Sequence, residues 1–220
     1  MDELKALIEK EIRLEWRQRY ALNGMMLYIV STVYVCYLGF NVRVGGIDAI
    51  TWNTLFWIVL LFTSVSAISK SFTQERAGRL LYYYTLASPQ SIILSKIIYN
   101  SCLVFLLSSV GFLVYSLVMG NPVENILMYW LSIFLGSVGF SSTLTLVAGI
   151  ASKAENNATL MAVMSFPLIL PVLLIVISLA KNALDGIAWS VVQDKILLLA
   201  GIDIIVIGLS YILFPFLWRS

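Results

Sequence analysis

The chain has 220 residues, of which 60% are hydrophobic and only 12% are charged. A soluble globular domain is typically about 25% charged and about 45–50% apolar, so the composition argues against a soluble protein. The apolar residues fall in uncharged blocks of about twenty residues, the helix length that crosses about 30 Å of hydrocarbon. Strands of a membrane barrel would alternate instead. The composition therefore predicts an all-α polytopic membrane protein.

Residues 1–20 precede the first apolar block and combine apolar residues at helical spacing with many charges. This pattern predicts an amphipathic helix. Because the helix runs directly into a spanning block, we expect it to lie in the membrane surface with its apolar side down. A soluble helix packed on a partner is the alternative. The apolar side consists of Leu4, Leu7, Ile8, Ile12 and Trp16.

Six blocks long enough to span the membrane follow, and we place the permease domain at 21–220. Lys96 stands at the entry of the third block, where its long stem allows the charge to reach the interface. The segment before the sixth block, an outer loop at about 181–195, suits a short helix at the interface, with Trp189 in it. The blocks are at about 21–40, 50–69, 97–119, 126–151, 158–180 and 196–217.

Two blocks carry features that predict how the helices pack. In the fourth, small and hydroxyl residues share one face, which lets helices approach closely in lipid. In the fifth, two prolines each remove a backbone donor, so we expect this helix to bend or break near its middle. The packing residues are Ser132, Gly136, Gly139 and Thr143, and the prolines are Pro167 and Pro171.

The positive-inside rule gives the orientation. With the N-terminus in the cytoplasm, 11 of the 14 basic residues lie inside and 3 lie outside. The outside residues are Arg43, Lys181 and Lys195. We therefore expect both termini in the cytoplasm, together with the polar stretch between the second and third blocks.

The sequence offers little for catalysis. It has no histidine, the commonest general base and haem ligand, and no Gly-Lys-Ser/Thr triplet of a phosphate-binding loop. The one carboxylate deep in a predicted span is Asp203, in the sixth block. An intramembrane acid is costly and often functional, so it is a possible intramembrane polar site. It serves either a structural hydrogen bond or proton or substrate coupling.

The stretch from Phe72 to Pro89 is the longest interruption between hydrophobic blocks after the N-terminus. It is too apolar for a free linker and too short to span. Its charged residues suit docking of a short cytoplasmic helix into a groove on a soluble protein. An interfacial helix with tyrosines at the lipid headgroups is the alternative. The residues expected to couple to a partner are Glu75, Arg76, Gly78, Arg79, Tyr83 and Pro89.

The order of these elements along the whole chain resembles that of ABC-2-type permeases. Within that class the chain is most similar to the haem exporter protein B (CcmB) family. The similarity lies in Phe72, Glu75 and Gly78 leading to 86–89, in 167–174 and in 213–219. The family usually has a leucine-rich run with another acid after the glycine, where this chain has Arg79-Leu80-Leu81-Tyr82-Tyr83-Tyr84.

The resemblance implies a non-catalytic permease subunit of the cytochrome c maturation system in the bacterial inner membrane. It implies a CcmA-like ATPase whose nucleotide cycle moves the coupling helix, and CcmC-like, CcmD-like and CcmE-like haem-handling partners. No cofactor is expected in this chain, because ATP and haem would be bound by partners. A homodimer is expected, and nucleic acid is not. The other functions considered are an ABC-2 permease for a lipid, glycan or drug, and a motor-free secondary transporter or scaffold.

Overall fold

The computed structural model describes residues 2–17, 19–41, 47–69, 71–72, 87–152 and 157–219. In these residues there are seven helices and no strand, and six of the helices are long and apolar enough to cross a membrane. The predicted all-α class with six spans is therefore confirmed. The helices are α1 (Asp2–Arg17), α2 (Arg19–Asn41), α3 (Ala49–Ile68), α5 (Pro89–Met119), α6 (Ile126–Ala151), α7 (Asn157–Leu184) and α8 (Trp189–Arg219).

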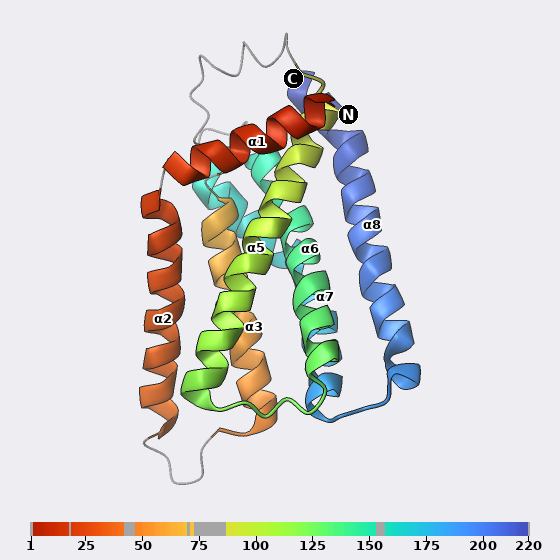
Figure 1. The fold of residues 1–220 in the computed structure, drawn as a ribbon. Helices are drawn as coiled ribbons and strands as arrows, with labels where there is room; N and C mark the ends of the chain where they lie inside the picture. Colours follow the sequence, from red (N-terminus) through yellow and green to blue (C-terminus); the bar gives the residue numbers. More distant parts are fainter. Residues whose placement is uncertain are drawn as a thin grey trace.

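The six long helices form a bundle, and α1 lies across one end of it (Figure 1). Both chain termini lie at this end, which we call the α1 end. The central helix is α6, which packs against α3, α5, α7 and α8. By contrast, α2 stands at the edge and packs mainly against α5 and α3.

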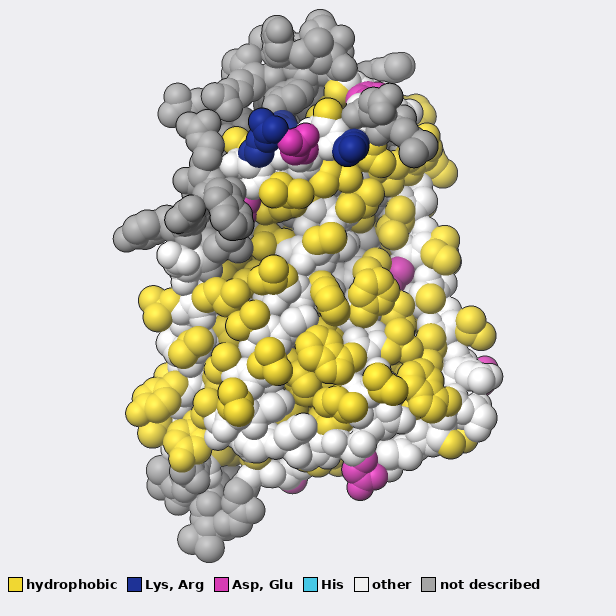
Figure 2. Space-filling view, in the orientation of Figure 1, with side chains coloured by type: hydrophobic (Ala, Val, Ile, Leu, Met, Phe, Trp, Pro, Cys, Tyr) yellow, Lys and Arg dark blue, Asp and Glu magenta, His cyan; other side chains and the backbone are white. Residues whose placement is uncertain are grey.

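The surface of the bundle matches a lipid environment. Figure 2 shows hydrophobic side chains across the middle of one face, with the Lys and Arg side chains gathered at the α1 end. Many large apolar side chains are exposed, among them Leu27, Leu117 and Phe216, which are 69%, 85% and 72% exposed. In water such a surface would aggregate, but in hydrocarbon it needs no partner.

Two caps determine where spanning helices begin. Asp48 caps α3: its Oδ2 accepts a hydrogen bond from the Thr51 backbone N–H (3.0 Å) and its Oδ1 one from the Thr51 hydroxyl (2.6 Å). These hydrogen bonds lower the pKa of Asp48. Ser88 caps α5, and Pro89 is the first residue of that helix. Proline suits this position because the missing N–H would have no helical partner there.

Several helix bounds differ from those expected from hydropathy. α5 begins at Pro89 rather than 97, so its 31 residues measure about 46 Å, more than the hydrocarbon thickness. α7 ends at Leu184 and α8 begins at Trp189, so helix replaces most of the loop expected at 181–195. Hydropathy does not detect these ends of α5, α7 and α8 because the helices continue there with polar residues.

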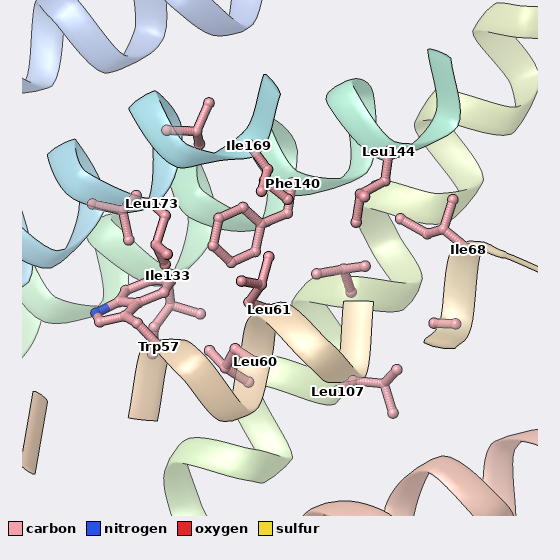
Figure 3. Close-up of a cluster of buried hydrophobic side chains, with 14 of the residues drawn as sticks. Trp57, Leu60, Leu61, Ile68, Leu107, Ile133, Phe140, Leu144, Ile169 and Leu173 are labelled. Atoms are coloured by element: carbon pink, nitrogen blue, oxygen red, sulfur yellow. The ribbon is translucent and has the colours of Figure 1, made fainter. Parts of the chain in front are cut away.

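The interior is a layer of aliphatic and aromatic side chains around α6. Figure 3 shows Trp57, Leu60 and Leu61 of α3 facing Phe140 and Ile133 of α6, with Ile169 and Leu173 of α7 beside them. Two glycines of α6 let its neighbours approach. A Cβ atom at Gly136 would lie 2.8 Å from the Trp57 ring and 3.1 Å from Val176. One at Gly139 would lie 2.7 Å from both Val172 and Asp203.

We therefore expect Gly136→Ala to destabilise the bundle by about 1–3 kcal/mol, as overpacking of a filled core does. Unfolding of the purified protein in detergent or nanodiscs measures this free energy. Gly208→Ala in α8 is the matched control, because nothing lies within 4 Å of a Cβ atom at Gly208. If both variants have the same stability, the contact at Gly136 does not limit packing.

Candidate functional site

The clearest cluster of interacting charged side chains lies at the α1 end, around Lys96 in the second turn of α5. Lys96 is fully buried, and its Nζ lies 3.1 Å from Glu11 Oε1 of α1. The same Nζ donates a hydrogen bond to the Ser71 carbonyl oxygen (2.7 Å) and lies 4.7 Å from the centroid of the Phe72 ring. The charged end of Lys96 thus reaches α1, the helix that lies across the end of the bundle, and its expected reach to the membrane interface stays a prediction. Lys96 holds α1, α5 and the chain after α3 together.

The side of α1 that faces the bundle is partly charged. Leu7 and Glu11, one turn apart, are both buried at 8% exposure, whereas Ile12 is 50% exposed. The expected apolar side is thus displaced around the helix, because Glu11 turns inward to meet Lys96. Lys10 also pairs with Glu11, at 2.8 Å. A buried lysine needs such a partner, since an unpaired charge away from water is costly.

A second carboxylate of α1 holds the other end of the 72–89 stretch. Glu3 Oε1 accepts a hydrogen bond of 2.6 Å from the backbone N–H of Ser88. Ser88 is the N-cap of α5, so this contact is made at the start of that helix, where a negative charge is favoured. Glu3 and Glu11 therefore connect α1 to both ends of the stretch, directly at Ser88 and through Lys96 at Ser71.

Phe72 connects the start of the 72–89 stretch to α8. Its side chain is 6% exposed, and its ring lies 6.0 Å from the ring of Phe214 in α8. Gly149 of α6 leaves room for both rings, since a Cβ atom there would lie 3.1 Å from Phe214 and 3.5 Å from Phe72. A displacement of Phe72 would therefore disturb its contacts with α5, α6 and α8.

Most of the expected coupling residues cannot be placed. Glu75, Arg76, Gly78, Arg79 and Tyr83 lie outside the described residues. Pro89 is described, and it is the first residue of α5 rather than part of a separate coupling helix. Their role in coupling stays a prediction.

Hydroxyl and amide side chains continue from Lys96 into the bundle between α5 and α6. Asn100 Nδ2 donates to Thr145 Oγ1 at 2.8 Å, and Ser101 is hydrogen-bonded to Ser141. Such bonds join helices in lipid, where apolar contact alone gives little preference for association. These hydrogen bonds therefore join α5 to α6 next to the Lys96 cluster.

The remaining expected site residues lie deeper in the bundle. Ser132, Gly136, Gly139 and Thr143 are all buried, and the two glycines are the close contacts described above. The backbone of α7 is helical through Pro167 and Pro171, so the helix does not break there, and a bend stays a prediction. Asp203 is 14 residues from the start of α8 and 16 from its end, and so lies near the middle of the helix.

Asp203 has no ionic partner among the described residues, and neither carboxyl oxygen accepts or donates a hydrogen bond there. It is 4% exposed and faces Gly139 of α6. Within the part of the chain that the structure describes, no three Cys, Asp or Glu side chains come together to hold a metal ion.

These features define a multi-pass helical membrane protein, in which the helix across one end of the bundle, α1, is joined to the chain between two spans. The comparisons with known proteins agree with this class. The family model described as CcmB protein matches residues 2–217, and the chain belongs to the CcmB family. No curated protein and no solved structure matches it.

Membership gives the chain its broad role. CcmB proteins are the membrane permease component of haem export for cytochrome c maturation, a transporter subunit rather than an enzyme. Membership also implies association with ABC transporter components such as CcmA. It favours haem export over the lipid, glycan or drug permease and over the motor-free transporter.

Sequence reasoning missed Glu3, Glu11 and Lys96 as a connected group. A signal for Glu11 was present, because it follows Leu4 and Leu7 at helical spacing and so lies on the same side of α1. Its partner Lys96 is 85 residues away, and no local pattern relates the two.

We expect Glu11→Gln to destabilise the bundle by about 3–5 kcal/mol, because the fully buried Lys96 loses its charged contact with Glu11. Lys96→Met should cost less, since Glu11 keeps Lys10 as a partner, and the double variant should recover part of the loss. Unfolding in nanodiscs measures all three.

The control for this series is Glu9→Gln, which breaks the exposed pair of Glu9 with Arg13 (58% and 75% exposed). It should change the stability by no more than about 1 kcal/mol. A Glu11→Gln variant as stable as Glu9→Gln would show that the buried pair does not hold α1.

Proposed function

We propose that this chain transmits the nucleotide cycle of a CcmA-like ATPase to the membrane part of a haem-export complex. The ATPase docks on the 72–89 stretch, and its movement reaches the bundle through α1 and α5. The observation that carries the proposal is the attachment of both ends of this stretch to α1, through Glu3 at Ser88 and through Glu11 and Lys96 at Ser71.

The route into the membrane follows from the contacts at the start of the stretch. Phe72 packs against Lys96 and Phe214, so a pull on this residue acts on α5 and α8 at once. Asn100 and Thr145 pass displacement of α5 to α6. A packed interface of this kind shifts between discrete arrangements rather than deforming continuously, which suits a two-state transporter.

The proposal includes an arrangement in the cell. The α1 end faces the cytoplasm, as the distribution of basic residues predicts, in the bacterial inner membrane. The chain works as a homodimer with the ATPase, beside CcmC-like, CcmD-like and CcmE-like proteins. Haem iron is held by those partners, because the chain has no histidine to ligate it. ATP hydrolysis then drives haem export or the release of haem-loaded chaperone.

The docking contact is tested by reversing charges in the stretch, with Glu75→Arg and Arg79→Glu in one variant. Charge-assisted hydrogen bonds to the ATPase would become repulsive, so co-purification of the ATPase and the yield of mature cytochrome c should both fall at least tenfold. The bundle should keep its melting temperature. If the ATPase still co-purifies and is still regulated, the docking assignment is wrong.

Transmission is tested separately with Glu3→Gln, which weakens the contact at Ser88 but leaves the stretch itself unchanged. The ATPase should still co-purify, while haem-dependent cytochrome maturation falls several-fold. Glu9→Gln, on an exposed side chain of the same helix, is the control. If the two variants are equally active, the contact of α1 at Ser88 does not transmit the movement of the ATPase.

A further inference from the structure

Three buried side chains of α6, α7 and α8 have polar atoms without a hydrogen-bond partner among the described residues. These atoms are both carboxyl oxygens of Asp203, Thr143 Oγ1 and Ser165 Oγ. The three residues are each at most 4% exposed. Two further such atoms, Trp57 Nε1 of α3 and Ser116 Oγ of α5, are uncharged donors or hydroxyls. Buried polar groups are normally hydrogen-bonded, and a carboxyl group without a partner is the most costly of them, so Asp203 requires an explanation.

Thr143 and Ser165 lie on the stripes of α6 and α7 that face each other, and Asp203 of α8 contacts this interface at Gly139. Gly139 marks the level of Asp203, because it is in contact with both Asp203 and Val172. Thr143 is one turn beyond Gly139 on α6, and Ser165 is two turns before Val172 on α7. At 1.5 Å per residue these offsets are about 6 Å and about 10 Å along the helix axes.

Both offsets lead from Asp203 toward the α1 end of the bundle. α6 and α7 are antiparallel, since Gly136 approaches Val176 while Gly139 approaches Val172. The C-terminal part of α6 is at the α1 end, where Gly149 meets Phe72. Thr143 and Ser165 therefore lie between Asp203 and the α1 end, and together the three side chains form a line of polar groups from the middle of the membrane.

In the part of the chain that the structure describes, no positive charge is paired with Asp203, and Lys195 of the same helix donates instead to Ser178 of α7. The neighbours of Asp203 are Gly139 of α6 and Val172 of α7, and neither α6 nor residues 157–180 of α7 contain a charged residue. The ionisable side chains of α5 and α6 are engaged elsewhere or exposed. Lys96 binds Glu11, Tyr99 binds Glu15, Tyr115 donates to the Trp52 carbonyl, Tyr129 donates to Asn53, and Cys102 is exposed.

We propose that Asp203 is a proton-binding site inside the membrane, and that α8 packs against Gly139 of α6 only while Asp203 is protonated. An ionised carboxylate without a donor or a countercharge is costly in this position, whereas the neutral acid is tolerated. A divalent cation is a poor alternative, because it takes about six or more oxygen ligands and Gly139 and Val172 offer no side-chain oxygen.

Protonation of Asp203 is thereby coupled to the position of α8. Loss of the proton leaves a negative charge that water must solvate, so α8 has to separate from Gly139. Return of the proton, through water that enters beside the hydroxyls of Thr143 and Ser165 once α8 has separated, allows the close contact to form again. This goes beyond the ATPase-driven role proposed above and does not depend on it, because it concerns the bundle alone.

Infrared spectroscopy of the full chain in lipid nanodiscs tests the protonation state directly. At neutral pH the wild type should show the carbonyl stretching band of a protonated carboxylic acid. Asp203→Asn should lose this band, and Asp194→Asn, at an exposed position of the same helix, should keep it. A wild type without the band, or a band that survives Asp203→Asn, overturns the proposal.

Two further measurements test the linkage and the route. As the medium is made alkaline, the melting temperature of the wild type should fall more than that of Asp203→Asn, because unfolding releases the proton of Asp203. Parallel curves would contradict the link to packing. The deuterium shift of the band should be several-fold slower in Thr143→Val and in Ser165→Ala. Unchanged rates would rule out the route along these hydroxyls.

Discussion

Lipid gives spanning helices no hydrophobic reason to associate, so this bundle depends on how closely its backbones approach α6. Gly136 and Gly139 admit Trp57, Val176, Val172 and Asp203 to distances that any Cβ atom would prevent. Dispersion contacts and hydrogen bonds then supply the attraction that water would supply in a soluble protein. Because α6 meets four other spans, the same stripe determines the positions of α3, α7 and α8.

The α1 end is governed by a different constraint, which is the need to accommodate a buried positive charge. Lys96 has a carboxylate, a backbone carbonyl and an aromatic ring around it, contributed by α1 and by the chain after α3. Burying an ion pair is costly in itself and gives specificity mainly when its partners have one possible arrangement. Here that arrangement joins a surface helix, a spanning helix and the stretch that we propose meets the ATPase.

The sequence predicts the spans well because long apolar blocks have few alternatives in a membrane. It also places the small residues of α6 and the acid of α8 on the correct helices. It does not reveal the early start of α5, since the turn from Pro89 to Lys96 is too polar for a hydropathy window. The inward orientation of Glu11 and the contact of Asp203 with Gly139 depend on partners far along the chain, and no local pattern encodes them.

The contacts of Glu11 with Lys96 and of Glu3 with Ser88 each join residues 85 positions apart. During synthesis from the N-terminus, neither contact is possible until the start of α5 has left the ribosome. By then α2 and α3 have already been made, and α1 takes its final position mainly against α5. α1 is thus made well before it can be fastened, and its final position depends on the third span having been made.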